Sequence, residues 1–162
     1  MSFEIELGRR LWACQEGGFR EWRTHQVLAE TLTDAGFVVD AFGTIPGFVA
    51  TIHGHPRETT VALITDMDAL PLGGGEYRHM CGHHQQMTAL CTTALRLQKD
   101  CPDLLQRVSF IALPAEEYVE LDARQELIDD GTISHVSGKQ EMLHRGLFDH
   151  YRAVVATHSA GL

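Results

Sequence analysis

Hydrophobic residues along the chain follow two alternating patterns. Short apolar runs rich in β-branched and aromatic residues predict strands at residues 37–42, 48–53, 61–65, 108–113 and 152–157. Apolar residues spaced three and four positions apart predict helices at about residues 4–14, 21–35, 83–99 and 140–145. Because the strands alternate with helices, the pattern indicates an α/β fold built on an open sheet.

Two segments fit neither pattern. Residues 73–75 are three successive glycines, and this loop is too rich in glycine for regular structure to be expected. Its glycines also lack the spacing of a phosphate-binding loop, so it is not expected to bind a nucleotide. Residues 118–138 are charged and poorly periodic, and they give no prediction of regular structure.

Composition narrows the class of protein. The chain has 162 residues, of which 44% are hydrophobic, so residues 1–162 are expected to form a single α/β domain with a proper core. The formal net charge is −9 and there is no basic run, which argues against nucleic acid and anionic membranes as partners. No apolar stretch is long enough to span a membrane, and no leader is apparent at Met1.

The four cysteines indicate a reducing environment. They show neither paired CxxC spacing nor the density of a disulfide scaffold, and they are Cys14, Cys81, Cys91 and Cys101. We therefore expect a cytoplasmic protein, in which Cys81 can serve as a thiolate ligand. Cys91 falls on the apolar face of its predicted helix and is expected to pack in the core.

Polar residues with metal-binding side chains follow three of the predicted strands. Asp66 and Asp68 come after the strand at 61–65, Glu116 and Glu117 after that at 108–113, and His158 after the last. A histidine- and cysteine-rich stretch, 79–84, opens the helix at 83–99. Because an open α/β sheet places its site at the carboxyl ends of its strands, these residues predict a site for a borderline-soft ion such as Zn²⁺.

Each piece of this pattern also has an ordinary structural explanation. A lone Cys-Gly-His is a weak motif, because small buried cysteines and turn glycines are common. A pair of glutamates is usually the solvated start of a helix. The metal site is favoured because the pieces recur at the ends of successive strands, although chance clustering stays an alternative.

Four motifs together resemble one family of metalloenzymes. They are Asp-Met-Asp-Ala-Leu-Pro at 66–71, His-x-Cys-Gly-His at 79–83, Pro-Ala-Glu-Glu at 114–117 and an apolar strand that ends in His158. This combination is similar to the zinc aminoacylase and carboxypeptidase family, in the branch of hippurate hydrolase and the N-acyl-amino-acid and auxin-conjugate amidohydrolases. The resemblance implies a three-layer α/β/α sandwich with a mostly parallel mixed sheet, present here as an incomplete catalytic domain.

The resemblance also implies roles for individual residues. Glu116 matches the general base and Asp68 a supporting carboxylate. The implied metal ligands are Cys81, His83, Glu117 and His158. The family site typically holds two divalent ions, of which zinc is expected first and manganese, cobalt or nickel are acceptable. The implied reaction is hydrolysis of the amide bond of an N-acyl amino acid or peptide by a metal-activated water.

Three departures from the family pattern leave two interpretations open. His84, Gln85 and Gln86 stand where the family usually has Asp-Gly-His, residues 118–139 look like an insertion, and full members are more than twice as long. The first interpretation is the amino-terminal part of an amidohydrolase, poorly active alone and completed by a missing portion or partner chain. The second is a non-catalytic metal-binding or interaction module. A truncated catalytic domain would expose the sheet edge and helix faces meant for its missing half, so self-association or a complementary chain is expected.

Overall fold

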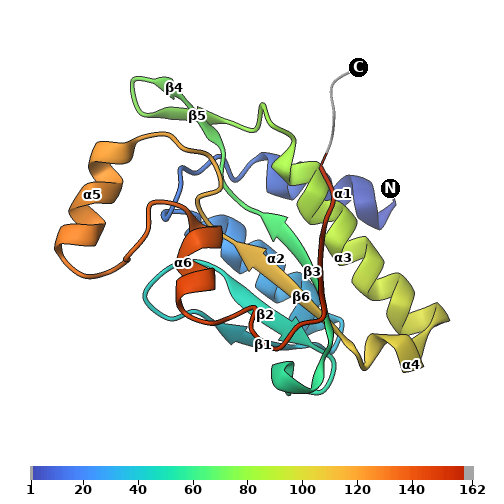
Figure 1. The fold of residues 1–162 in the computed structure, drawn as a ribbon. Coiled ribbons are helices and arrows are strands. Elements are labelled where there is room, and N and C mark those ends of the chain that lie inside the picture. The colour runs from blue at the N-terminus through green and yellow to red at the C-terminus, as the bar shows by residue number, and fades with distance from the viewer. Residues whose placement is uncertain (1, 159–162) are drawn as a thin grey trace.

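A five-stranded mixed sheet forms the centre of the fold (Figure 1). The structure is a computed structural model and describes residues 2–158. The strands lie in the order β1 (Val38–Ala41), β2 (Phe48–Thr51), β6 (Val108–Leu113), β3 (Val61–Asp66) and β7 (Ala153–Ala156). The pairs β6–β3 and β3–β7 are parallel, whereas β1–β2 and β2–β6 are antiparallel. The α/β class expected from the alternating pattern is confirmed.

Three helices cover one face of the sheet. They are α1 (Phe3–Trp12), α2 (Trp22–Asp34) and α3 (His83–Asp100). Their apolar stripes meet strands β2 and β6 in one core cluster, where the Phe110 and Phe37 rings contact edge to face at 5.5 Å. Cys91 lies fully buried in this cluster, as its position on the helix predicted. Burial of these stripes outweighs the cost of ordering the helices.

A thinner layer covers the opposite face. It contains the short helix α6 (Gly138–His144), which lies in front of the sheet in Figure 1. Met142 of α6 and Ile133 of the preceding loop pack in a cluster with Ile111 of β6. All six residues of β6 are buried, including those that point to this face, so the strand is covered on both faces of the sheet. The three-layer arrangement implied by the family resemblance is therefore confirmed.

The glycine-rich segment was predicted wrongly. Residues 70–78 form a two-stranded hairpin of β4 (Leu70–Gly73) and β5 (Glu76–Arg78). Gly73, Gly74 and Gly75 have φ values of 92°, 62° and 83°, and these left-handed conformations let the chain reverse between the strands. The glycines thus make the turn of a hairpin rather than an irregular loop.

The charged segment after β6 also contains regular structure that the sequence did not predict. Helix α5 (Leu121–Asp129) lies within it and is held to the domain by Arg124, whose side chain is buried and donates to the Val136 carbonyl at 2.7 Å. Glu120 accepts hydrogen bonds from Arg20 at 2.8 Å and from Tyr77 at 2.7 Å. These bonds join the start of α5 to the β4–β5 hairpin through Tyr77 and to the segment before α2 through Arg20.

Two short helical turns complete the described chain, α4 (Pro102–Leu105) and the 3₁₀ turn η1 (Pro56–Glu58). Each begins with a proline, whose fixed φ suits the first position of a helix. Within residues 2–158, no helix combines the length and apolar character needed to cross a membrane.

Candidate metal centre

The candidate site lies where the three parallel strands end. Asp66 is the last residue of β3, Glu116 and Glu117 follow β6, and His158 follows β7. His83 is the first residue of α3, which starts beside the end of β3 (Figure 1). Gly82 precedes it with φ 89°, a conformation that favours glycine and that turns the chain into the helix. The topology therefore brings chemically active residues from four elements to one edge of the sheet.

His83 is oriented by Asp68. The imidazole is 1% exposed, and its Nδ1 lies 2.8 Å from the Asp68 carbonyl oxygen and 3.1 Å from the Asp68 carboxylate Oδ1. Both of these oxygens are acceptors, so Nδ1 carries a proton, and Nε2 is the ring nitrogen that can offer a lone pair to a cation once its own proton has left. His83 Nε2 is buried and has no hydrogen-bond partner among residues 2–158.

The two partners shift each other's protonation. Burial alone lowers the pKa of His83, but the neighbouring Asp68 carboxylate outweighs burial and raises that pKa to about 9. Burial tends to raise the pKa of Asp68, but the hydrogen bond and charge of His83 together with the main-chain N–H groups of Glu116 and Glu117 outweigh it, so this pKa is lowered. Without a metal the pair is therefore an ion pair at neutral pH, and an arriving cation must displace a proton from His83.

Cys81 and His158 meet next to His83. The Cys81 Sγ lies 3.2 Å from His158 Nε2, and the His83 and His158 rings are 5.7 Å apart at 85°. One ligand atom from each of these three residues falls within 4.8 Å of the others. Burial, helped by the nearby Glu117 carboxylate, raises the pKa of the Cys81 thiol to about 12. The sulfur thus becomes a thiolate only when a cation replaces its proton.

A sharp turn directs the two glutamates. Ala115 has φ 51°, a left-handed conformation that is strained for a residue with a Cβ. Its N–H donates to the buried Glu21 carboxylate at 2.7 Å, and burial raises the pKa of Glu21 well above its usual range. Beyond the turn, the Glu117 N–H donates to Asp68 Oδ2 at 2.9 Å. Asp68 therefore fixes both His83 and the main chain at Glu117.

A second group of candidate ligands shares His83 with the first. His83, Glu116 and Glu117 each offer one ligand atom within 4.8 Å of the other two. The Glu116 Oε2 lies 3.9 Å from His83 Nε2, and the Glu117 Oε1 is buried with no hydrogen-bond partner in the described chain. Buried polar atoms without hydrogen-bond partners, such as these, cost free energy unless an ion or another group binds them. A thiol, two imidazoles and two carboxylates around such atoms fit a divalent cation.

Two side chains at the site were missed by the sequence analysis. Lys139, in the first turn of α6, donates from Nζ to Asp66 Oδ2 at 2.9 Å and to Glu116 Oε1 at 3.4 Å. Gln86 of α3 accepts from the Asp66 N–H at 2.9 Å through Oε1. No local pattern marks these residues, because their partners lie far away in the sequence. Burial tends to lower the pKa of Lys139, but the hydrogen bonds and charges of the Asp66 and Glu116 carboxylates together outweigh it and raise this pKa, so the ammonium is charged at neutral pH.

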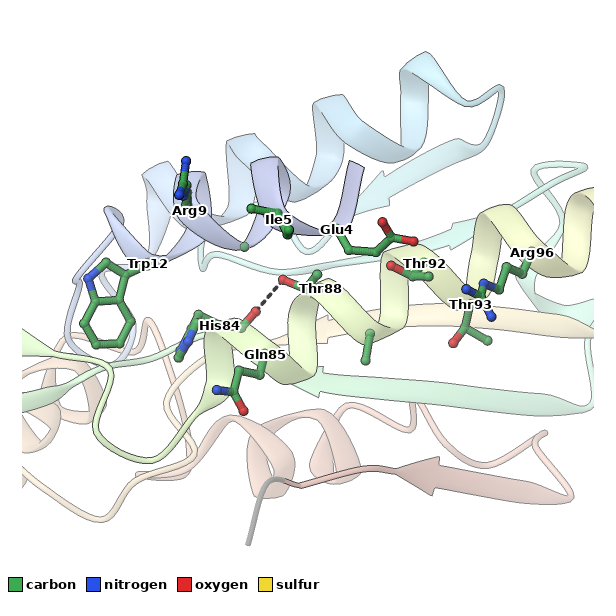
Figure 2. A pocket seen from close by; sticks show the side chains of 12 residues that line it. Glu4, Ile5, Arg9, Trp12, His84, Gln85, Thr88, Thr92, Thr93 and Arg96 are labelled. Carbon is green, nitrogen blue, oxygen red and sulfur yellow. Dashed lines mark hydrogen bonds between the residues drawn. The ribbon is translucent and has the colours of Figure 1, made fainter. Parts of the chain in front are cut away.

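His79 and His84 do not join the candidate ligands in the described chain. The His79 ring is buried against α1, with Nε2 2.9 Å from the Cys14 carbonyl oxygen. His84 packs edge to face on Trp12 at 4.7 Å. Figure 2 shows both rings of that pair at one end of a groove between α1 and α3, which encloses about 680 Å³. The histidine-rich stretch therefore divides between the candidate site and this groove.

Curated proteins with similar sequences are carboxypeptidases and amidohydrolases, although no protein-family model matches the chain. Thermostable carboxypeptidase 2 of Saccharolobus solfataricus is 30% identical over 143 residues, which cover 82% of this chain and 36% of that protein. The N-acyl-L-amino acid amidohydrolase of Geobacillus stearothermophilus is 27% identical over 164 residues, covering 95% of this chain and 40% of the relative. The chain thus spans less than half the length of these relatives.

Solved structures share the fold. A Bacillus subtilis protein described as a dinuclear metal binding peptidase from the M20 family matches with a TM-score of 0.75 and 23% identity, over 97% of this chain and 42% of that one. An aminobenzoyl-glutamate utilization protein from Klebsiella pneumoniae matches with a TM-score of 0.67 and 21% identity, over 97% of this chain. The chain therefore spans less than half the length of each of these two structures.

Proposed function

Because this chain belongs to the aminoacylase and carboxypeptidase family of metallopeptidases, we propose that it forms the metal-binding part of a metal-dependent amidohydrolase. The substrate class is an N-acyl amino acid or a peptide, in keeping with the names of its relatives. The single observation that carries the proposal is the buried, unpartnered Nε2 of His83, with candidate ligand atoms of Cys81, His158 and Glu117 around it.

The ions would be held by residues of two overlapping groups that share His83. The proposed ligands are Cys81, His83, Glu117 and His158. Zinc is the ion expected first, because thiolate and imidazole together suit it, and manganese, cobalt and nickel are also acceptable to this donor set. When bound, divalent ions supply a lowered pKa for water and polarisation of the scissile carbonyl.

Glu116 is the proposed general base. Its Oε2 is directed toward the candidate ligands, 3.9 Å from His83 Nε2, and its side chain is one-third exposed, so both water and substrate can reach it. A carboxylate in this position can accept the proton of the attacking water and pass it to the leaving amine. Asp68 acts through His83 and Glu117, because it fixes the imidazole and the main chain at the second glutamate.

We further propose that hydrolysis needs more protein than this chain. The relatives are more than twice as long as the segment they share with it, and β7, which leads to His158, has all four residues exposed. The exposed outer edge of β7 suits pairing with a second strand, so we expect self-association or a complementary chain. A single boundary in sedimentation at the monomer mass would contradict this expectation.

Metal binding by the purified chain tests the proposal directly. The apo protein is titrated with Zn²⁺, Mn²⁺, Co²⁺ or Ni²⁺ by calorimetry, and retained metal is measured after dialysis. We expect saturable binding that is lost in Cys81→Ala and kept in Cys101→Ala, a matched change at an exposed cysteine. Assays on N-acyl amino acids follow, with the chain alone and with a lysate fraction of complementary protein.

The outcomes separate the parts of the proposal. If the protein retains no metal, or binds metal equally well after Cys81→Ala, the proposed metal site is contradicted, and the proposed hydrolase activity is contradicted with it. Robust hydrolysis by this chain alone would leave the metal site standing and refute the need for further protein. Metal binding without hydrolysis under every condition favours the non-catalytic module.

A further inference from the structure

Lys139 occupies a fixed position beside the proposed general base. Its Nζ lies 2.9 Å from Asp66 Oδ2 and 3.4 Å from Glu116 Oε1. Helix α6 is held against the turn that carries Glu116, because the Gly138 N–H donates to the Ala115 carbonyl at 3.1 Å. An added Cβ on Gly138 would lie 1.9 Å from the Pro114 carbonyl oxygen, so only glycine allows this approach. The lysine therefore comes from an element that is packed on the same turn.

Asp66 holds the ammonium in place. The carboxylate is 2% exposed and ends β3, and its Oδ2 accepts from both Lys139 and Gln86, the latter at 3.4 Å. Gln86 also accepts from the Asp66 N–H, so the aspartate is bound at its main chain and its side chain. A buried carboxylate with this set of donors leaves the lysine little freedom to move away.

The two oxygens of Glu116 face different partners. Oε1 faces Lys139, whereas Oε2 lies toward His83 Nε2 and belongs to the ligand group that Glu116 forms with His83 and Glu117. Glu116 is thus close enough to coordinate an ion as well as to act as a base. An ammonium and a divalent cation compete for the same carboxylate, because both are attracted by its charge and its oxygen atoms.

We propose that Lys139 is a positioning residue that keeps Glu116 out of the metal coordination shell. It thereby divides the two adjacent glutamates into one base and one ligand. This inference rests on the proposed metal site, and it goes beyond that site by assigning the division of roles to a residue outside the metal ligands. Lysine suits the task, since a compact charge on a long stem can bind one carboxylate oxygen and leave the other free.

A double-mutant cycle on metal affinity tests the inference without any assay of hydrolysis. The dissociation constant for Zn²⁺ is measured by competition with a chromophoric chelator in the wild type, Lys139→Met, Glu116→Gln and the double variant. We expect Lys139→Met to tighten binding by about tenfold, the scale of effects that surrounding residues have on metal sites, and by less than about threefold in the Glu116→Gln background. Glu116→Gln alone should leave the affinity close to that of the wild type.

The cycle distinguishes an extra ligand from a simple loss of positive charge. Equal tightening in both backgrounds would mean that Lys139 acts only through its charge, and would overturn the inference, as would no tightening in either. Lys139→Gln serves as a second variant if Lys139→Met does not fold. X-ray absorption of the zinc-loaded variant provides an independent readout, because the inference requires one more oxygen ligand than in the wild type. If the wild type binds no zinc, the metal site itself fails.

Discussion

The pairing of His83 with Asp68 makes the stability of the metal-free protein depend on pH. The structure raises the pKa of His83 from 6.5 to about 9, mainly through the Asp68 carboxylate, against the opposing effect of burial. A group whose pKa is raised on folding stabilises the folded state fully below its unfolded pKa, and this contribution is lost as the pH rises through its folded pKa. The window for His83 therefore runs from about pH 6.5 to about pH 9.

Replacing Asp68 with asparagine should remove this contribution. A rise in pKa from 6.5 to about 9 corresponds to about 3 kcal/mol of unfolding free energy, as an upper value for a buried pair. In Asp68→Asn the hydrogen bond and the charge of the carboxylate are lost, and burial is then opposed by the carbonyl at position 68 and the Asp66 charge, so most of the rise in the pKa of His83 should disappear. We expect the variant to be less stable than the wild type by up to about 3 kcal/mol at pH 6, with the difference narrowing by a similar amount at pH 9.5.

Urea unfolding in the presence of a chelator measures this difference. Both proteins are unfolded at pH 6 and at pH 9.5, and the change of their stability difference with pH is the quantity of interest. Asp103→Asn, at an exposed position in α4, provides a control whose stability difference from the wild type should be the same at pH 6 and at pH 9.5. A stability difference between wild type and Asp68→Asn that is constant over this range would refute the reasoning, because the loss would then be unrelated to protonation of His83.

Three further expectations concern the site and the packing. Zinc binding at pH 7 should release close to two protons, because the pKa of the Cys81 thiol is raised to about 12 and that of His83 to about 9. Calorimetry in two buffers of different ionisation enthalpy counts the released protons. Release of fewer than one proton would contradict Cys81 and His83 as ligands. Gly138→Ala should destabilise the protein by about 1–3 kcal/mol in chemical unfolding. Gly8→Ala in α1 should not destabilise it, because the added Cβ meets only Thr88 Oγ1 of α3, at an ordinary contact distance of 3.5 Å. Phe110→Ala should cost about 3–5 kcal/mol in the same assay, and a loss below about 1 kcal/mol would show that the core cluster repacks around the cavity.

Much of the sheet could be predicted because the ends of its strands are marked in the sequence by a change from apolar to polar residues. The runs predicted at 61–65 and 108–113 became β3 (Val61–Asp66) and β6 (Val108–Leu113), each a short apolar stretch that ends at polar residues. The helix predicted at 83–99 became α3 (His83–Asp100), since its apolar positions recur with a single helical period. Short apolar runs bounded by polar residues, and helices with one buried stripe, leave a clear signal in the sequence.

The elements that were missed owe their structure to distant contacts. The hairpin of β4 and β5 has few residues and a turn of three glycines. The hydrogen bond from Tyr77 to Glu120 attaches it to the start of α5. Helix α5 has a weak apolar stripe and is anchored instead by Arg124, a charged residue that sequence reasoning assigns to the surface. Neither contact can be inferred from neighbouring positions.

The same distinction applies to the candidate site. Cys81, His83, Glu117 and His158 lie close together because their positions follow from the ends of parallel strands and the start of a helix, which the sequence does indicate. Lys139 could not be found in this way, because it comes from α6, on the opposite face of the sheet from α3. Motifs therefore identified the candidate ligands, and the structure was needed to find Lys139, the residue that we propose to separate the roles of the two glutamates.

The exposed strand β7 has a consequence for how long a bound ion would stay. Among residues 2–158, its four residues pair only with β3, whereas His83 and Asp68 are anchored in the core. Edge strands with little burial open locally at a much lower free energy than the rest of a domain. Brief fraying of β7 would carry His158 away and leave the other proposed ligands in position, so the lifetime of the ion would follow the dynamics of this strand. A strand that pairs with the outer edge of β7 would suppress this fraying and so lengthen the time for which the ion stays bound.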